Sequence, residues 1–300
     1  MAEIKTIAVA GASGRLGKPV LDALLASGKF EVTVLTREGS NASFPEPVRV
    51  IPVDYTSLEA LTVAMSGQDA VVSLIGPSAI EAQIPLIEAA AAAKVNRFIP
   101  SEFTADIANT KTAALPVYKQ QIRMQEIVRG KAESVPGFTY TQIRNGVFLD
   151  WGLEIGFQVD LRSENPPFFD GGDRPFSSTT LRTIGDAVVG VLGHLEETKN
   201  RAVYVHDIVT TQRHLLDFAR KIAPDRRWEP VDVSTEEMEG QARDNYAKGR
   251  FDLQASMGFF CRSVFAEGHG GEFKQVDNEM LGLGMKGDAD LEVILRGLLL

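Results

Sequence analysis

The stretch "GASGRLG", residues 11–17, follows directly on the apolar run "IKTIAVA" at residues 4–10. Three glycines at this spacing, between a predicted strand and a predicted helix, match the loop that holds the pyrophosphate of a dinucleotide. Gly11 would allow the tight turn, Gly14 would leave room for the phosphates, and Gly17 would let the helix pack closely on the strand. The alternative is a turn with a purely structural role.

The N-terminus of the predicted helix adds a second property. Its unpaired N–H groups and its dipole favour a bound phosphate. We therefore expect Ser13, Arg15 and Leu16 to contact the cofactor together with the three glycines.

The chain around this loop alternates short apolar runs with longer helical patterns, which is typical of βαβ units and a parallel sheet. The predicted strands are Ile4–Ala10, Glu31–Thr36, Val48–Val53, Ala70–Ile75, Arg97–Pro100 and Tyr140–Arg144. The predicted helices between them are Arg15–Leu25, Ser57–Met65, Ala79–Ala93 and Pro116–Arg129. Thr56 and Glu59 match a capping box at the second helix, and Pro116 suits a first helical position. The expected fold class is α/β, a doubly wound parallel sheet of the NAD(P)-binding Rossmann type.

The pattern changes after about Asn145, where "RSENPPFFDGGDRPFSSTT" is rich in Pro, Gly, Ser and aromatic residues. Helices are predicted beyond it at Ile184–Leu195, at Gln212–Ile222 and after the capping box of Ser234 and Glu237. We predict a dinucleotide-binding domain over residues 1–150 and a smaller, C-terminal substrate-binding lobe over residues 151–300. One or two segments of that lobe are expected to return to the sheet.

The second predicted strand, "EVTVLTREGS", indicates which dinucleotide binds. NAD-binding folds usually end this strand with an acidic residue, whereas NADP needs a cation near its 2′-phosphate. This strand ends in Thr36 and Arg37. A guanidinium can hold a phosphate through two parallel hydrogen bonds, so Arg37 favours NADP, and Arg15 is a second candidate. Glu38 weakens this argument, and the alternative is that Arg37 is only a solvated loop cation.

Composition restricts the partners and the compartment. The 31 basic and 40 acidic residues give a net charge of −9, which argues against a nucleic-acid or anionic-membrane surface. The single cysteine, Cys261, cannot form an intrachain disulfide, and the first residues lack a signal-peptide pattern. No apolar run approaches the roughly 18 residues that a membrane span needs. We expect a cytoplasmic protein.

Three further segments carry a family resemblance: "RFIPSEF" at residues 97–103, "PVYKQQIRMQEIV" at 116–128 and "YTQIRNGVF" at 140–148. The chain resembles the NmrA-like and isoflavone-reductase-like group of atypical short-chain dehydrogenases over most of its length. "PSEF" is the most specific of the matching motifs. The resemblance implies an NADP-binding protein, either a plant-type reductase of phenylpropanoids, a fungal enzyme of specialised metabolism, or a regulator without turnover.

The resemblance also implies a catalytic residue. In the reductases of this group a lysine on the helix after "PSEF" acts as general acid/base beside the nicotinamide, and Lys119 aligns with it. Desolvation or a nearby cation lowers the pKa of a lysine, and Arg123, one turn further on, is a candidate for that cation. The alternative is that Lys119, Arg123 and Glu126 form a solvated helix face.

Other positions follow from the same alignment. Asn145 matches a polar position near the nicotinamide, and it also suits a turn before Gly146. Phe103 is expected against the cofactor or in the core, and Gly76 is expected to contact the cofactor. The tyrosine four residues before the lysine in ordinary short-chain dehydrogenases is absent, so Tyr118 is expected to be a packing or pocket-wall residue.

No other chemistry is indicated. The four histidines and Cys261 lack zinc-ligand spacing, so no metal is expected. The aromatic residues just after the sheet would either bind a flat apolar substrate or form the core of the small lobe; they are Trp151, Phe157, Phe168, Phe169 and Phe176.

Three functions remain open. The first is an NADPH-dependent reductase of an aromatic or conjugated small molecule, with Lys119 moving the proton. The second is an NmrA-type redox-sensing regulator that binds NADP, and the third is a cofactor-assisted isomerase or cyclase. The resemblance implies a monomer or a homodimer.

Overall fold

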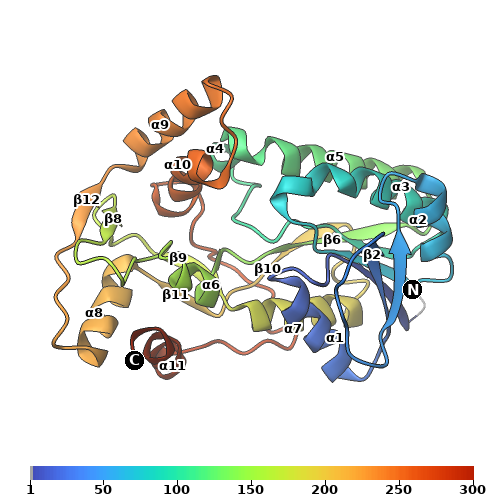
Figure 1. Cartoon of the computed structure of the whole chain (residues 1–300), viewed down its shortest axis with the longest axis horizontal. Helices are drawn as coiled ribbons and strands as arrows, with labels where there is room; N and C mark the ends of the chain where they lie inside the picture. Colours follow the sequence, from blue (N-terminus) through green and yellow to red (C-terminus); the bar gives the residue numbers. More distant parts are fainter. Residues whose placement is uncertain (1–2) are drawn as a thin grey trace.

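The computed structural model describes residues 3–300 (Figure 1). Within them, seven strands form one parallel sheet in the order β10-β6-β5-β4-β1-β2-β3. The strands are β1 (Thr6–Ala10), β2 (Glu31–Arg37), β3 (Arg49–Val53), β4 (Ala70–Ser73), β5 (Arg97–Ile99), β6 (Thr139–Arg144) and β10 (Arg201–Tyr204). This order reverses direction between β1 and β4, which confirms the predicted doubly wound sheet.

Both faces of the sheet are covered by helices, because side chains of successive strand residues point to opposite faces. On one face, Ile7 and Val9 pack with α1 (Gly17–Ser27) and α7 (Leu181–Gly193). On the other, Ala8 and Ala10 pack in a cluster with side chains of three helices. These are α2 (Leu58–Met65), α3 (Gln83–Ala92) and α5 (Lys119–Ser134), with α4 (Thr110–Ala113) and the 3-10 turns η1 (Pro77–Ala82) and η2 (Pro116–Tyr118) leading into them.

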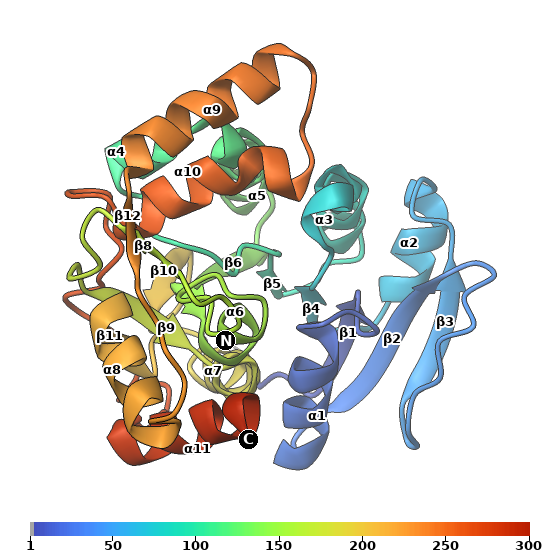
Figure 2. The same ribbon diagram turned by 60° about the vertical axis from the view of Figure 1, so that its left-hand side comes forward.

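The second half of the chain builds a lobe beside the sheet (Figure 2). Its strands are β7 (Val147–Phe148), β9 (Phe176–Thr179) and β11 (Ile208–Thr210) in one small sheet, and β8 (Pro167–Phe169) with β12 (Val231–Val233) in another. Its helices are α6 (Leu149–Glu154), α8 (Gln212–Ile222), α9 (Thr235–Ala247), α10 (Leu253–Phe265) and α11 (Asp288–Leu299). A separate apolar cluster lies inside this lobe.

The seventh strand of the large sheet comes from this second half. β10 pairs in parallel with β6, and the chain reaches it through α7, which packs against α1. Gly185 of α7 makes that approach possible, because a Cβ there would lie 2.7 Å from the backbone oxygen of Pro19.

Several predicted helix starts were wrong. Helix α1 begins at Gly17 rather than at Arg15, and α7 begins at Leu181 rather than at Ile184. Helix α2 is capped by Ser57, whose Oγ accepts a hydrogen bond from the N–H of Ala60 at 3.2 Å. Thr56 is not the cap residue; its hydroxyl donates to Asp54 Oδ1 at 2.7 Å. The helix predicted over residues 79–93 is divided into η1 and α3, because Ala79 has non-helical backbone angles. Pro116 opens η2 as predicted.

Candidate active site

The carboxyl ends of the parallel strands bring most of the predicted site residues to one edge of the sheet. The glycine loop follows β1, Gly76 follows β4 and Asn145 follows β6. Ala10, the last residue of β1, pairs with Leu35 of β2 and with Ser73 of β4. The loop therefore lies at the point where the strand order reverses, which is where ligands bind in open α/β sheets.

Two of the three glycines are required by the fold itself. Gly11 has a φ of +84°, and a Cβ there would lie 2.5 Å from the backbone oxygen of Leu74. A Cβ on Gly17 would lie 2.2 Å from the backbone oxygen of Gly11. Gly14 differs, because the closest atom to its Cβ would be that same oxygen at 3.3 Å. The fold alone therefore explains Gly11 and Gly17 better than it explains Gly14.

A cavity of about 700 Å³ opens beside this loop. Ser13, Gly14 and Arg15 line it from one side, and residues of α6 and α11 line it from the other. Helix α1 begins at this cavity with Leu16 as N-cap residue, no side-chain cap and no acidic residue in its first turn. Lys18 N–H already donates to the oxygen of Gly14 at 3.2 Å, and Pro19 has no N–H. The N–H groups of Arg15, Leu16 and Gly17 have no backbone partner among residues 3–300 and are available to an anion.

Arg15 has partners that the sequence did not indicate. Its guanidinium forms an ion pair with Glu154 of α6 and lies 5.8 Å from the ring centre of Trp151. The side chains of Arg15 and Glu154 are both about half exposed. The pair joins the glycine loop to the second lobe across the cavity.

Arg37 and two further predicted residues lie along the same edge. Arg37 is the exposed last residue of β2, level with Val53 of β3. Gly76 is exposed at the start of η1. Phe103 is buried in the same apolar cluster as Ile143, on the face of the sheet that α1 and α7 cover. This agrees with the second of its two predicted roles, a core residue. Their contact with a cofactor stays a prediction.

Lys119 is the exposed first residue of α5. Among residues 3–300, no hydrogen bond or ion pair engages its side chain. Arg123 pairs instead with Glu81 of η1 at 3.6 Å. Lys119, Arg123 and Glu126 are all exposed, so both the solvated-face alternative and a lysine able to reach a ligand fit this arrangement.

Tyr118, directly before Lys119, is a packing residue. Its side chain is buried, and its hydroxyl lies 2.8 Å from the Oγ of Ser263 on α10. Burial raises the pKa of Tyr118 despite that hydrogen bond. The Tyr118 hydroxyl is therefore protonated at neutral pH and buried from solvent.

Asn145 is fully buried at the end of β6. Its Nδ2 donates to the backbone oxygen of Gly146 at 3.1 Å, but its Oδ1 has no partner among residues 3–300. Gly146 itself needs to be glycine, because its φ is +64° and a Cβ would lie 2.3 Å from the oxygen of Ser177. The turn role of Asn145 is thus present, and its Oδ1 is a buried acceptor without a partner among residues 3–300.

The aromatic set after the sheet serves mainly as core. Phe168, Phe169 and Phe176 are buried in the apolar cluster of the second lobe, and Phe157 packs against it. Trp151 lines the glycine-loop cavity. In residues 3–300 no three His, Cys, Asp or Glu side chains are grouped to hold a metal ion, and no helix there is long and apolar enough to cross a membrane.

The comparison with protein families agrees with this geometry. A model described as the NmrA-like family matches residues 3–222, from the first strand to the end of α8. This chain belongs to the NmrA-like family. The match covers the glycine loop and every predicted site residue.

Several known proteins are similar to this NmrA-like chain. Oxidoreductase poxI of Penicillium oxalicum is 36% identical over 254 residues, which are 83% of this chain and 77% of that protein. Oxidoreductase aprR of Aspergillus flavus is 32% identical over 302 residues, which are 98% and 99%. The solved structure of AtPrR2 with NADP⁺ and (+)pinoresinol shares the fold, with a TM-score of 0.80 at 19% identity over 99% and 100%. The names of the fungal relatives agree with the expectation of an oxidoreductase.

The "PSEF" segment of this NmrA-like chain contains an ion pair that sequence reasoning missed. Glu102 Oε2 lies 2.9 Å from Nη1 of Arg144, and both side chains are almost fully buried. Gln125 of α5 donates to the same carboxylate oxygen at 2.8 Å. Glu102 thus connects the ends of β5 and β6 to the helix that begins at Lys119. The available signal was one charged residue of each sign at the ends of two predicted strands, Glu102 in "PSEF" and Arg144 in "IRN".

Proposed function

We propose that this protein is an NADPH-dependent reductase of a small aromatic or conjugated molecule. The observation that carries the proposal is the glycine loop. Gly11 and Gly17 are needed for folding, whereas Gly14 leaves its backbone open to the cavity at the start of an uncapped helix. A pyrophosphate at this position explains the third glycine.

The residues of this edge fit a dinucleotide. The N–H groups of Arg15, Leu16 and Gly17, which have no backbone partner among residues 3–300, would hold the pyrophosphate, and Arg37 would hold a 2′-phosphate. The unpaired Oδ1 of Asn145 is buried, and it would accept a hydrogen bond from the nicotinamide end once the side chain turns toward the cofactor. The presence of NADP⁺ in AtPrR2 supports the choice of cofactor. Bound NADPH would supply the hydride.

Lys119 would supply the proton. A reduction that adds a hydride to a conjugated system also needs one proton, which the Nζ of Lys119 would give to the atom that gains negative charge. Its side chain is exposed and has no partner among residues 3–300. The ion pair of Glu102 and Arg144, together with Gln125, would keep the start of α5 at a fixed distance from Asn145.

The test replaces Lys119 by Met and follows NADPH oxidation with a panel of phenolic ethers, enones and quinones. General acid/base catalysis contributes on the order of 10²–10⁴ in rate, so turnover should fall by at least 100-fold while NADPH still binds. Lys131→Met is the matched control, because Lys131 lies on the same helix and pairs with Glu88. Full turnover in Lys119→Met would remove the lysine from the mechanism.

The stoichiometry of the same assay separates the remaining alternatives. A net reductase consumes one NADPH for each product molecule. An isomerase or cyclase would form product without net NADPH consumption, and a regulator would bind NADPH but turn over no substrate. The cytoplasmic location and the monomeric or homodimeric state stay predictions.

A further inference from the structure

The side chain of Arg15 connects the glycine loop to the second lobe. Its residue carries one of the three backbone N–H groups that are available to an anion at this loop. The side chain itself is about half exposed and reaches α6, where it pairs with Glu154. One residue therefore belongs both to the place proposed for the diphosphate and to the contact between the two halves of the chain.

Two side chains of α6 hold this guanidinium. The carboxylate of Glu154 forms the ion pair, and the ring centre of Trp151 lies 5.8 Å from the guanidinium carbon. Helix α6 is fixed in turn, because the Asp150 carboxylate accepts the N–H of Leu181, the first residue of α7, at 3.2 and 3.3 Å. We call Glu154 and Trp151 together the Arg15 clasp.

The clasp and a bound diphosphate would compete for the same cation. Gly14, Arg15 and Glu154 line one cavity, so the Glu154 carboxylate lies beside the place proposed for the diphosphate. Two anions brought together at a binding site oppose association. A diphosphate has more acceptor oxygens and more negative charge than one carboxylate, and the positive end of the α1 dipole also attracts it. A diphosphate should therefore draw Arg15 out of the clasp, while Glu154 lowers the net affinity.

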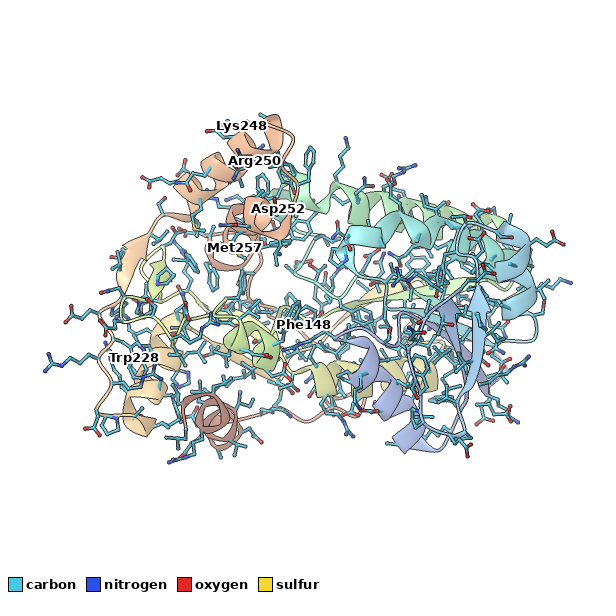
Figure 3. The ribbon with its side chains drawn as sticks, viewed as in Figure 1. Phe148, Trp228, Lys248, Arg250, Asp252 and Met257 are labelled. Carbon is cyan, nitrogen blue, oxygen red and sulfur yellow. The ribbon has the colours of Figure 1, made fainter. Side chains whose placement is uncertain are left out.

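The clasp also leads toward the nicotinamide end of the proposed site. The ring centre of Trp151 lies 5.3 Å from that of Phe148. Phe148 ends β7, which begins two residues after Asn145. Figure 3 labels Phe148 between the sheet and the second lobe, and Trp228 on the side of that lobe away from the sheet. Release of Arg15 would therefore change the surroundings of Trp151 and leave those of Trp228 as they are.

We propose that Glu154 and Trp151 hold Arg15 away from the cofactor until a dinucleotide binds, and that Glu154 thereby lowers the affinity for the diphosphate. Glu154 is a positioning residue in this arrangement, because it acts through Arg15. The proposal rests on the proposed function for the identity of the cofactor. It adds that the second lobe takes part in cofactor binding through α6.

The first measurement is a calorimetric titration of the full chain with NADPH. Glu154→Gln removes the charge and keeps the shape of the side chain. Exposed ion pairs contribute little, so we expect NADPH to bind about threefold more tightly in this variant. Glu154→Ala should act in the same direction, which keeps the test valid if one variant fails to fold. An unchanged or weaker affinity in the folded variants would overturn the proposal.

Two controls separate the clasp from a general effect of charge. Glu292→Gln removes the same charge from α11, another wall of the cavity, where Glu292 pairs with Arg296 of its own helix. This variant should leave the NADPH affinity unchanged. In an Arg15→Gln chain, Glu154→Gln should no longer raise the affinity, because the two side chains act as a pair. An equal rise in Glu292→Gln, or a full rise without Arg15, would reject the clasp.

Tryptophan emission follows the departure of Arg15 itself. The probe is NADP⁺, which does not absorb in the range of tryptophan emission as NADPH does. Emission should change as NADP⁺ saturates the chain, and both Trp151→Phe and Arg15→Gln should abolish this change. Constant emission while calorimetry shows NADP⁺ to be bound would mean that Arg15 stays on α6. A change that persists in Arg15→Gln would also contradict the proposal.

This proposal and the proposed function fail in different ways. If neither NADPH nor NADP⁺ binds to any folded variant, both are refuted. If the dinucleotides bind but the Glu154 variants and the tryptophan emission do not respond, only the role of the clasp is refuted.

Discussion

Replacing Gly14 by alanine should separate cofactor binding from folding. A Cβ at residue 14 would lie 3.3 Å from the backbone oxygen of Gly11, so this neighbour needs to give way by only a few tenths of an ångström. Alanine also reduces the entropy of the unfolded chain, which stabilises a protein by about 0.4–1 kcal/mol where the backbone permits it. The free energy of unfolding should therefore change by less than about 1 kcal/mol.

The added methyl group would project toward the cavity where the phosphates are proposed to lie. We expect NADPH affinity to fall at least tenfold, which corresponds to about 1.4 kcal/mol of binding free energy. The assay is a calorimetric titration with NADPH, run beside thermal unfolding of the same preparation. Both measurements are needed, because unfolded protein would also fail to bind.

Gly17→Ala is the control with the opposite expectation. Its Cβ would lie 2.2 Å from the oxygen of Gly11 and 2.6 Å from the backbone carbon of Ala12, neither of which can move alone. Overpacking of this kind costs about 3 kcal/mol. The melting temperature should then fall by roughly 6 °C. If Gly14→Ala bound NADPH as tightly as the unmodified chain, the pyrophosphate would not lie over this loop and our reasoning would fail.

Three further predictions concern single side chains. Arg37→Ala should lower NADPH affinity more than tenfold and leave NADH affinity unchanged in parallel titrations; a surviving preference for NADPH would mean that another cation binds the 2′-phosphate. Glu102→Gln leaves the charge of Arg144 buried without a counter-charge. The free energy of unfolding, measured with denaturant, should therefore fall by about 3–5 kcal/mol. A decrease below about 1 kcal/mol would contradict the stabilising role of the pair. Burial lowers the pKa of His206, although nearby acids act in the opposite direction. As the pH falls, His206 is therefore protonated in the unfolded chain before it is protonated in the folded chain. Stability should therefore decrease as the pH falls below the ordinary pKa of 6.5, and less steeply in His206→Gln; equal slopes in denaturant titrations would reject this assignment.

The parts of the fold that the sequence predicted depend on local patterns. The first six strands and the glycine loop are read from runs of neighbouring residues, such as the continuous apolar run "IAVA" of β1. The seventh strand, β10, is only Arg201–Tyr204 long and carries three partly exposed residues, so its pattern was too weak to indicate a sheet strand. Its place next to β6 comes from the packing of α7 on α1, which no local pattern reports.

The same limit applies to the site. Residues of the loop and of the strand ends were found because the topology of a parallel sheet places them at one edge. The pair of Glu102 and Arg144 joins residues that are 42 positions apart. The Oδ1 of Asn145 became visible as an unpaired acceptor only when the burial of its surroundings was known. Pairings across this distance depend on tertiary structure, and periodicity does not encode them.

The cations near the glycine loop show why partners decide their roles. Arg15 pairs with Glu154, and Lys18 pairs with Asp22. Arg37 has no ion pair with a carboxylate among residues 3–300. Exposed ion pairs contribute only about 0–1 kcal/mol, so a bound phosphate could still recruit Arg15, but only by breaking its link to α6. Arg37 can bind a phosphate without breaking any such link, and it is therefore the side chain on which a preference for NADP should depend.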